Sequence, residues 1–114
     1  MGLKRFFTEM GMGVDVHGRN ATRAAERAVF DAIHHSSLNL FAHVDKTRHD
    51  MRLTVMIGVP SPEAVDVDRV AAALPYGEVT VEVQAGGLEI PSEDGMDPIL
   101  IANAGVLVQF DEDD

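Results

Sequence analysis

The chain contains no cysteine, and this absence excludes several classes of site at once. Disulfide frameworks, thiolate zinc sites, iron–sulfur clusters and cysteine nucleophiles all need that residue. The sequence also has no stretch near the ~20 apolar residues of a membrane span. The apolar pair Phe6-Phe7 is interrupted by Thr8 and Glu9 before the core of a signal peptide could form. We therefore expect a cytoplasmic protein with no membrane partner.

Basic residues are absent from the last 45 positions. All nine lysines and arginines lie in the first 69 residues beside nine acidic ones, so the remaining ten acids carry the whole net charge of −10. Nucleic-acid binding needs cations that replace counterions along the phosphates. Without a basic surplus anywhere, we expect no nucleic-acid partner. The 114 residues predict one domain, residues 1–110, followed by a solvated acidic tail at 111–114.

Two hydrophobic patterns dominate the first third of the chain. Residues 3–16 alternate between an apolar face and a face of glycine and polar residues, which predicts a strand. A helix follows, with Asn20 as its N-cap. Its apolar stripe consists of Ala21, Ala24, Ala25, Ala28, Val29, Ala32 and Ile33. Because this stripe is rich in alanine, we expect the helix to pack closely against a sheet.

The remaining pattern predicts four more strand segments and one helix. We expect strands at 38–44 and 51–59, then a helix capped by Asp66 and ended by Pro75. Residues 78–84 alternate like an antiparallel strand with one wet face. Gly86-Gly87 would turn the chain, and the last strand, 99–110, would be interrupted at 103–105.

The predicted order is β-α-β-β-α-β-β, which indicates an α+β fold. A single mixed sheet would carry both helices on one face. The other face would then need cover, and association with further copies of the chain is the usual solution. We therefore expect a homo-oligomer, a trimer or a higher assembly. The six methionines are expected to fill the core.

The octet Gly11-Met12-Gly13-Val14-Asp15-Val16-His17-Gly18 is where local rules conflict. Glycines weaken a strand interior and often mark a close backbone approach. Asp15 and His17 would point the same way with Cα atoms roughly 6.5–7 Å apart. Together they could grip a metal, hold a ligand or act as a general base. Gly18, Arg19 and Asn20 lead into a helix N-terminus, which favours anions.

A packing interpretation accounts for the same residues. Gly11 and Gly13 would only let a helix or a second subunit come close, and Asp15 would cap the turn at 18–20. The octet does not have the third glycine of a dinucleotide fingerprint, since Val16 stands there. The metal ligands and any cofactor stay open, because none of the five histidines forms an HxH or HExxH spacing. Asn103 is a further candidate for a ligand contact.

Three segments together resemble an uncharacterised family of conserved hypothetical proteins of bacteria and plants. They are the GxGxDxHG octet, Phe7-Thr8-Glu9-Met10 before it and His35-Ser36-Ser37-Leu38 after it. The resemblance covers essentially the whole chain. It implies that Gly11, Gly13, Asp15, His17 and Gly18 form a site, but it implies no activity.

The order of elements is also similar to that of the trimeric Bacillus-type chorismate mutases and the related YjgF-like proteins. This resemblance implies a chorismate-mutase-like fold, a trimer and sites at subunit interfaces. Those mutases hold a dicarboxylate with arginines, one of them on a late strand, whereas nothing after Arg69 is basic here. We therefore do not expect mutase activity.

The sequence leads to one principal hypothesis and two alternatives. The principal one is a small-molecule site at a subunit interface, with Asp15 and His17 as candidate catalytic residues. Gly11, Gly13, Gly18, Arg19 and Asn20 would then bind the ligand. The alternatives are a structural or regulatory homo-oligomer without catalysis, and a metal-binding protein that uses Asp15 and His17. Whether the protein is an enzyme is left open.

Overall fold

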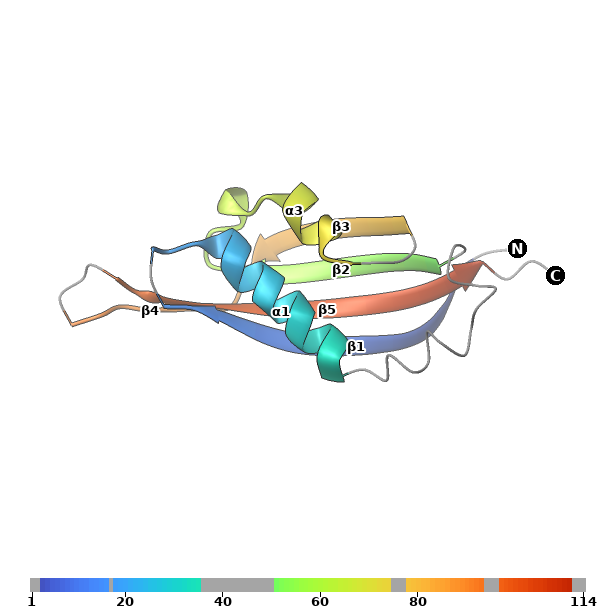
Figure 1. The fold of residues 1–114 in the computed structure, drawn as a ribbon, viewed down its shortest axis with the longest axis horizontal. Coiled ribbons are helices and arrows are strands. Elements are labelled where there is room, and N and C mark those ends of the chain that lie inside the picture. The colour runs from blue at the N-terminus through green and yellow to red at the C-terminus, as the bar shows by residue number, and fades with distance from the viewer. Residues whose placement is uncertain (1–2, 17, 36–50, 75–77, 94–96, 112–114) are drawn as a thin grey trace.

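The computed structural model describes residues 3–16, 18–35, 51–74, 78–93 and 97–111. Within these residues one mixed sheet carries two α-helices, as the α+β prediction requires (Figure 1). The strands are β1 (Leu3–Asp15), β2 (Met51–Val59), β3 (Glu78–Ala85), β4 (Leu88–Ile90) and β5 (Ile99–Asp111). The helices are α1 (Ala21–His35) and α3 (Val67–Ala72), with a 3-10 turn, η2 (Pro62–Ala64), between β2 and α3.

The long strand β5 lies inside the sheet, whose order is β1-β5-β2-β3. It is antiparallel to β1, β2 and the short β4. The strand expected at 38–44 lies outside the described residues. The short β4 was not predicted, because its three residues follow the Gly86-Gly87 pair with too few positions to show an alternation.

Two details of the predicted sheet were wrong. Residues 78–85 form a strand parallel to β2, not an antiparallel one. A period of two does not encode direction, and the crossover through η2 and α3 returns the chain to the same end of the sheet. The last strand is not interrupted at 103–105 either. It pairs there on both sides without a shift in register, and the one irregularity between β1 and β5 falls between Arg5 and Phe7.

The core lies between the sheet and the helices, on one face of the sheet (Figure 1). The alanines at 24, 25, 28 and 32 of α1 are completely buried. From the sheet come alternate residues of β2 and β5, and α3 adds Val70. Burial of such apolar surface stabilises the fold by roughly 25 cal/mol per Å². The alanine-rich stripe predicted for α1 is therefore confirmed as its core face.

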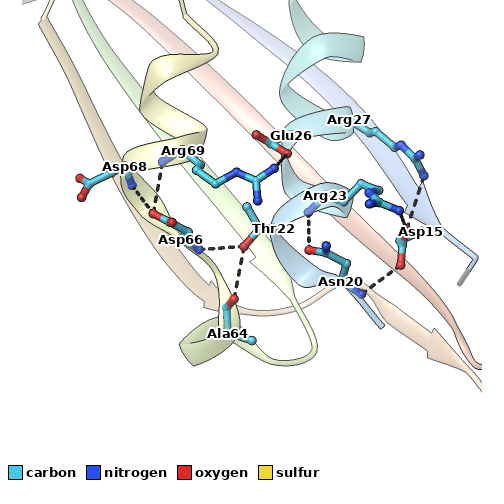
Figure 2. Close-up of polar contacts among 10 residues, drawn as sticks. All are labelled: Asp15, Asn20, Thr22, Arg23, Glu26, Arg27, Ala64, Asp66, Asp68 and Arg69. Carbon is cyan, nitrogen blue, oxygen red and sulfur yellow. Dashed lines mark hydrogen bonds and ion pairs between the residues drawn. The ribbon is translucent and has the colours of Figure 1, made fainter. Parts of the chain in front are cut away.

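A small polar cluster fastens α3 to α1 (Figure 2). The backbone N–H of Asp66 donates to the Thr22 hydroxyl at 2.9 Å, and that hydroxyl donates to the Ala64 carbonyl at 3.3 Å. Arg69 pairs with Glu26 at 2.9 Å. The Asp66 carboxylate also accepts from the first turn of α3, which confirms Asp66 as its N-cap.

Candidate functional site

The glycine side of the octet faces α1. A Cβ built on Gly11 would lie 2.4 Å from the Ala28 carbonyl oxygen, and one on Gly13 would lie 2.2 Å from the Ala24 carbonyl oxygen. No side chain of any kind fits there, so these glycines let the alanine face of α1 rest on the backbone of β1. The packing interpretation of Gly11 and Gly13 is thus what the geometry shows.

Asp15 follows on the same side of β1 and is buried, with 1% of its surface exposed. Its carboxylate accepts a hydrogen bond from the backbone N–H of Asn20 at 2.9 Å. It also lies 3.6 Å from an Arg23 guanidinium nitrogen and 3.7 Å from one of Arg27 (Figure 2). A buried carboxylate needs such partners to offset its desolvation. Asp15 therefore anchors the start of α1, the capping role that the packing interpretation gave it.

The residues between β1 and α1 form a fastened turn. Gly18 and Arg19 both have positive φ angles, 83° and 50°. The Gly18 N–H donates to Asp97 at 3.2 Å, and Arg19 pairs with Glu89 of β4 at 3.1 Å. Asn20 caps α1 by accepting from the Arg23 N–H at 3.0 Å. The start of α1 is thus already surrounded by carboxylates of this chain.

His17 lies outside the described residues, as do His43 and His49, so the paired action of Asp15 and His17 stays a prediction. His34 is exposed on α1 and stacks on Phe30, with ring centroids 3.9 Å apart. Among the described residues, no three acidic or histidine side chains gather in a group that could hold a metal ion.

The opposite face of the sheet, which neither helix covers, carries a second candidate site (Figure 1). Here the register aligns side chains in rows across the strands. One row contains Met10, Gly105, Met56 and Glu82, and the next contains Met12, Asn103, Gly58 and Gln84. A third, at the β4 end, contains Val14, Ile101 and Leu88. We call this surface the open face.

The open face exposes several large apolar side chains beside its polar residues Glu82, Asn103 and Gln84. Met10, Met12 and Met56 keep 76%, 53% and 38% of their surface accessible, so the expectation that these methionines fill the core was wrong. Leu88 and Ile90 of β4 are exposed by 60% and 44%. Exposed apolar side chains that gather on one face are typical of a surface that meets another molecule.

A shallow hollow of about 370 Å³ lies in the middle of the open face. Its floor at Gly105 is bare backbone, whereas the backbone of Gly86 covers Gly58, with its Cα 3.5 Å from the position of a Cβ on Gly58. Met10 and Met56 border it on one row, and Asn103 and Gln84 on the next. The remaining lining is Gly11, Ile57, Ala85, Gly86, Gly87 and Ala104, so no charged residue contributes.

Asn103 and Gly11 of this hollow were candidates from the sequence, whereas Met10, Met56 and Gln84 were not. The signal was present in β1: Met10, Met12 and Val14 form an apolar set on the side opposite Gly11, Gly13 and Asp15, which predicts that this side also meets apolar surroundings. Gly105 in the middle of a long strand was interpreted as an interruption, which diverted attention from the side chains beside it.

The described residues first define a class: an α+β fold in which both helices lie on one face of a single sheet and the other face exposes large apolar side chains. The chain belongs to the family described as Conserved hypothetical protein (Lin0512_fam), whose model matches residues 5–108. This confirms the resemblance to an uncharacterised family. Neither helix in the described part of the chain has the length and apolarity to cross a membrane.

The chain is also similar to a solved structure, an FtsZ-like protein of unknown function from Nostoc punctiforme. The two share 37% sequence identity with a TM-score of 0.82, over 98% of this chain and 99% of that one. A search of curated proteins gives no significant match.

Proposed function

We propose that the protein is a homo-oligomer in which the open face of one copy packs on another copy, and that the hollow becomes a small-molecule site at this interface. The observation that carries the proposal is the group of exposed apolar side chains on the open face, with a hollow among them. The sequence placed the site on the helix side of β1, where Asp15 is buried. The proposed site lies on the opposite side of the same strand.

The size of the open face supports a second copy as its cover. Four strands spaced ~4.8 Å apart and about ten residues of β5 at ~3.3 Å each give roughly 600 Å² per copy. Two copies would then bury about 1,200 Å², which reaches the lower end of specific interfaces. Packed sheets lie about 10 Å apart, so side chains of both copies would interdigitate.

The shallowness of the hollow supports a site that is completed by the second copy. Small-molecule sites bury most of the ligand surface, and a hollow open to solvent on one side cannot do so alone. A second sheet laid over it would supply the missing wall. Asp15 would then act as a structural anchor, and His17 would contribute only if the assembly brings it to the interface.

Molecular mass measured by light scattering tests the assembly. We expect an oligomer for the wild type and a monomer for Met56→Glu, because the new carboxylate would be desolvated in the interface. Val67→Glu is a matched control, since Val67 is similarly exposed at 43% but lies on α3. It should keep the wild-type mass.

A monomeric wild type at micromolar concentration, or an oligomer that persists in Met56→Glu, would contradict the assembly. Circular dichroism of each variant separates loss of association from loss of folding. The mass also distinguishes a dimer from the trimer that the chorismate-mutase resemblance implies. A metabolite thermal-shift screen on wild type and Gly105→Leu addresses the site: shifts confined to the wild type support it, and an oligomer that no compound stabilises favours the purely structural alternative.

A further inference from the structure

No contact with another described residue requires glycine at position 105. Its φ is not in the left-handed region, and a Cβ built on it meets nothing within 4 Å. Glycine inside a strand is destabilising relative to alanine, because it loses more conformational entropy on folding. At Gly11 and Gly13 this destabilisation is offset by the close contact with α1. At Gly105 no contact within the described chain offsets it. A glycine of this kind marks the approach of something from outside the chain.

The side chains on either side of Gly105 are the thioethers of two methionines. Met10 and Met56 occupy the strands on either side of it in the same row, so their Cα positions are about 9.6 Å apart, two strand spacings. That separation admits one flat ring between two thioether side chains. Methionine sulfur makes favourable contacts with aromatic rings at such distances. The space over Gly105, between Met10 and Met56, is therefore suited to an aromatic ring that contacts the strand backbone.

The neighbouring row supplies hydrogen bonds. Asn103 and Gln84 lie on either side of Gly58, and both are exposed. Their side-chain amides form no hydrogen bond with another described residue. Each amide offers a donor and an acceptor. Since no charged residue lines the hollow, and the chain itself is strongly acidic, a charged ligand would gain no partner and an anion would be repelled.

We infer that the hollow binds an uncharged, flat aromatic ring that carries a carboxamide-like edge. The ring lies between Met10 and Met56 over Gly105, and its edge exchanges hydrogen bonds with the amide of Asn103, beside the Gly86 backbone that covers Gly58. The inference rests on the proposed function, because the second copy closes the site above the ring.

Three fragment probes of similar size test this class of ligand: benzamide, benzoate and toluene. Backbone amide shifts in ¹H–¹⁵N NMR spectra report binding residue by residue. We expect benzamide to shift the signals of Gly58, Asn103 and Gly105, with an affinity at least about tenfold above those of benzoate and toluene. Asn103→Leu should weaken benzamide about tenfold, and Gly105→Leu should abolish its binding. Gln109→Leu, on the same face of β5 but outside the hollow, should change nothing.

Equal binding of benzoate or toluene would overturn the inference, as would benzamide shifts that fall elsewhere or survive in Gly105→Leu. Light scattering on the same samples separates this failure from that of the proposed function. If the protein is an oligomer that does not bind benzamide, only the ligand class is refuted. If it is a monomer that does not bind benzamide, both the ligand class and the assembly are refuted. A monomer that binds benzamide in the hollow refutes the assembly and retains the ligand.

Discussion

The two faces of the sheet use glycine for different purposes, and the contrast is sharpest between Gly13 of β1 and Gly105 of β5. At Gly13 a Cβ would lie 2.2 Å from the Ala24 carbonyl oxygen, because α1 rests directly on the strand. At Gly105 a Cβ would meet nothing within 4 Å. On the helix side glycine is required by a contact inside the chain, and on the open side it leaves a space.

This difference changes how the octet is understood. Gly11, Gly13 and Asp15 of the octet hold α1 in place. The two glycines let the helix backbone lie directly on β1, and the Asp15 carboxylate accepts a hydrogen bond from the N–H of Asn20, where the helix begins. Met10, just before the first glycine, and Met12, between the two, point to the open face. One strand thus carries a structural element on one side and a candidate interface on the other.

The largest expected effect is that of Gly13→Val. The added side chain would force α1 away from β1 and expose its alanine face, so we expect a loss of more than about 3 kcal/mol in the free energy of unfolding. Urea denaturation followed by circular dichroism measures it. Gly105→Val, on the opposite side of the sheet, is the control and should fold normally. Similar losses in both variants would abolish the distinction between the two faces.

Removal of the Asp15 carboxylate should have an intermediate effect. Asp15→Ala loses a charge-assisted hydrogen bond to Asn20 and its buried position beside Arg23 and Arg27, which predicts a loss of about 2–3 kcal/mol. Asp15→Asn keeps an acceptor oxygen and should lose less. Arg23→Gln removes only a half-exposed partner and should cost under about 1 kcal/mol. Wild-type stability in Asp15→Ala, measured by the same denaturation, would show that the anchor is dispensable.

The smallest expected effect is a gain. Gly105→Ala replaces a strand glycine where the backbone is compatible and space is free, so the isolated subunit should gain about 0.4–1 kcal/mol. The comparison is made in the Met56→Glu background, in which only the subunit contributes to the melting temperature. A lower melting temperature in this background would reveal an internal contact at Gly105 and remove the basis for the inferred ligand site.

Most of the fold was predictable because it follows from hydrophobic period. The strand at Met51–Val59 and the helix from Ala21 appear where the alternation and the alanine stripe indicate them. Asp66 was predictable as a cap from its position before an apolar run. The direction of β3 was not, since period alone does not say at which end a crossover returns the chain.

The candidate site was harder to predict for a related reason. Alternation shows that Gly13 and Asp15 share one side of β1, and that Met10 and Met12 share the other, but it does not say which side a helix will cover. From the pattern alone, the polar, glycine-bearing side was expected to be the accessible one. In the structure that side is buried at Asp15, and the apolar side carries the exposed methionines.

The sequence by itself determined the periods, the caps, the absence of cysteine chemistry and the concentration of negative charge in the last 45 residues. These are local or compositional properties, set by the order of side chains along the chain. Only the tertiary structure decided that α1 lies on the glycine side of β1, and that Met10, Met56 and Asn103 gather around Gly105. Strand register and the covered face depend on contacts between residues far apart in sequence, and no local pattern records them.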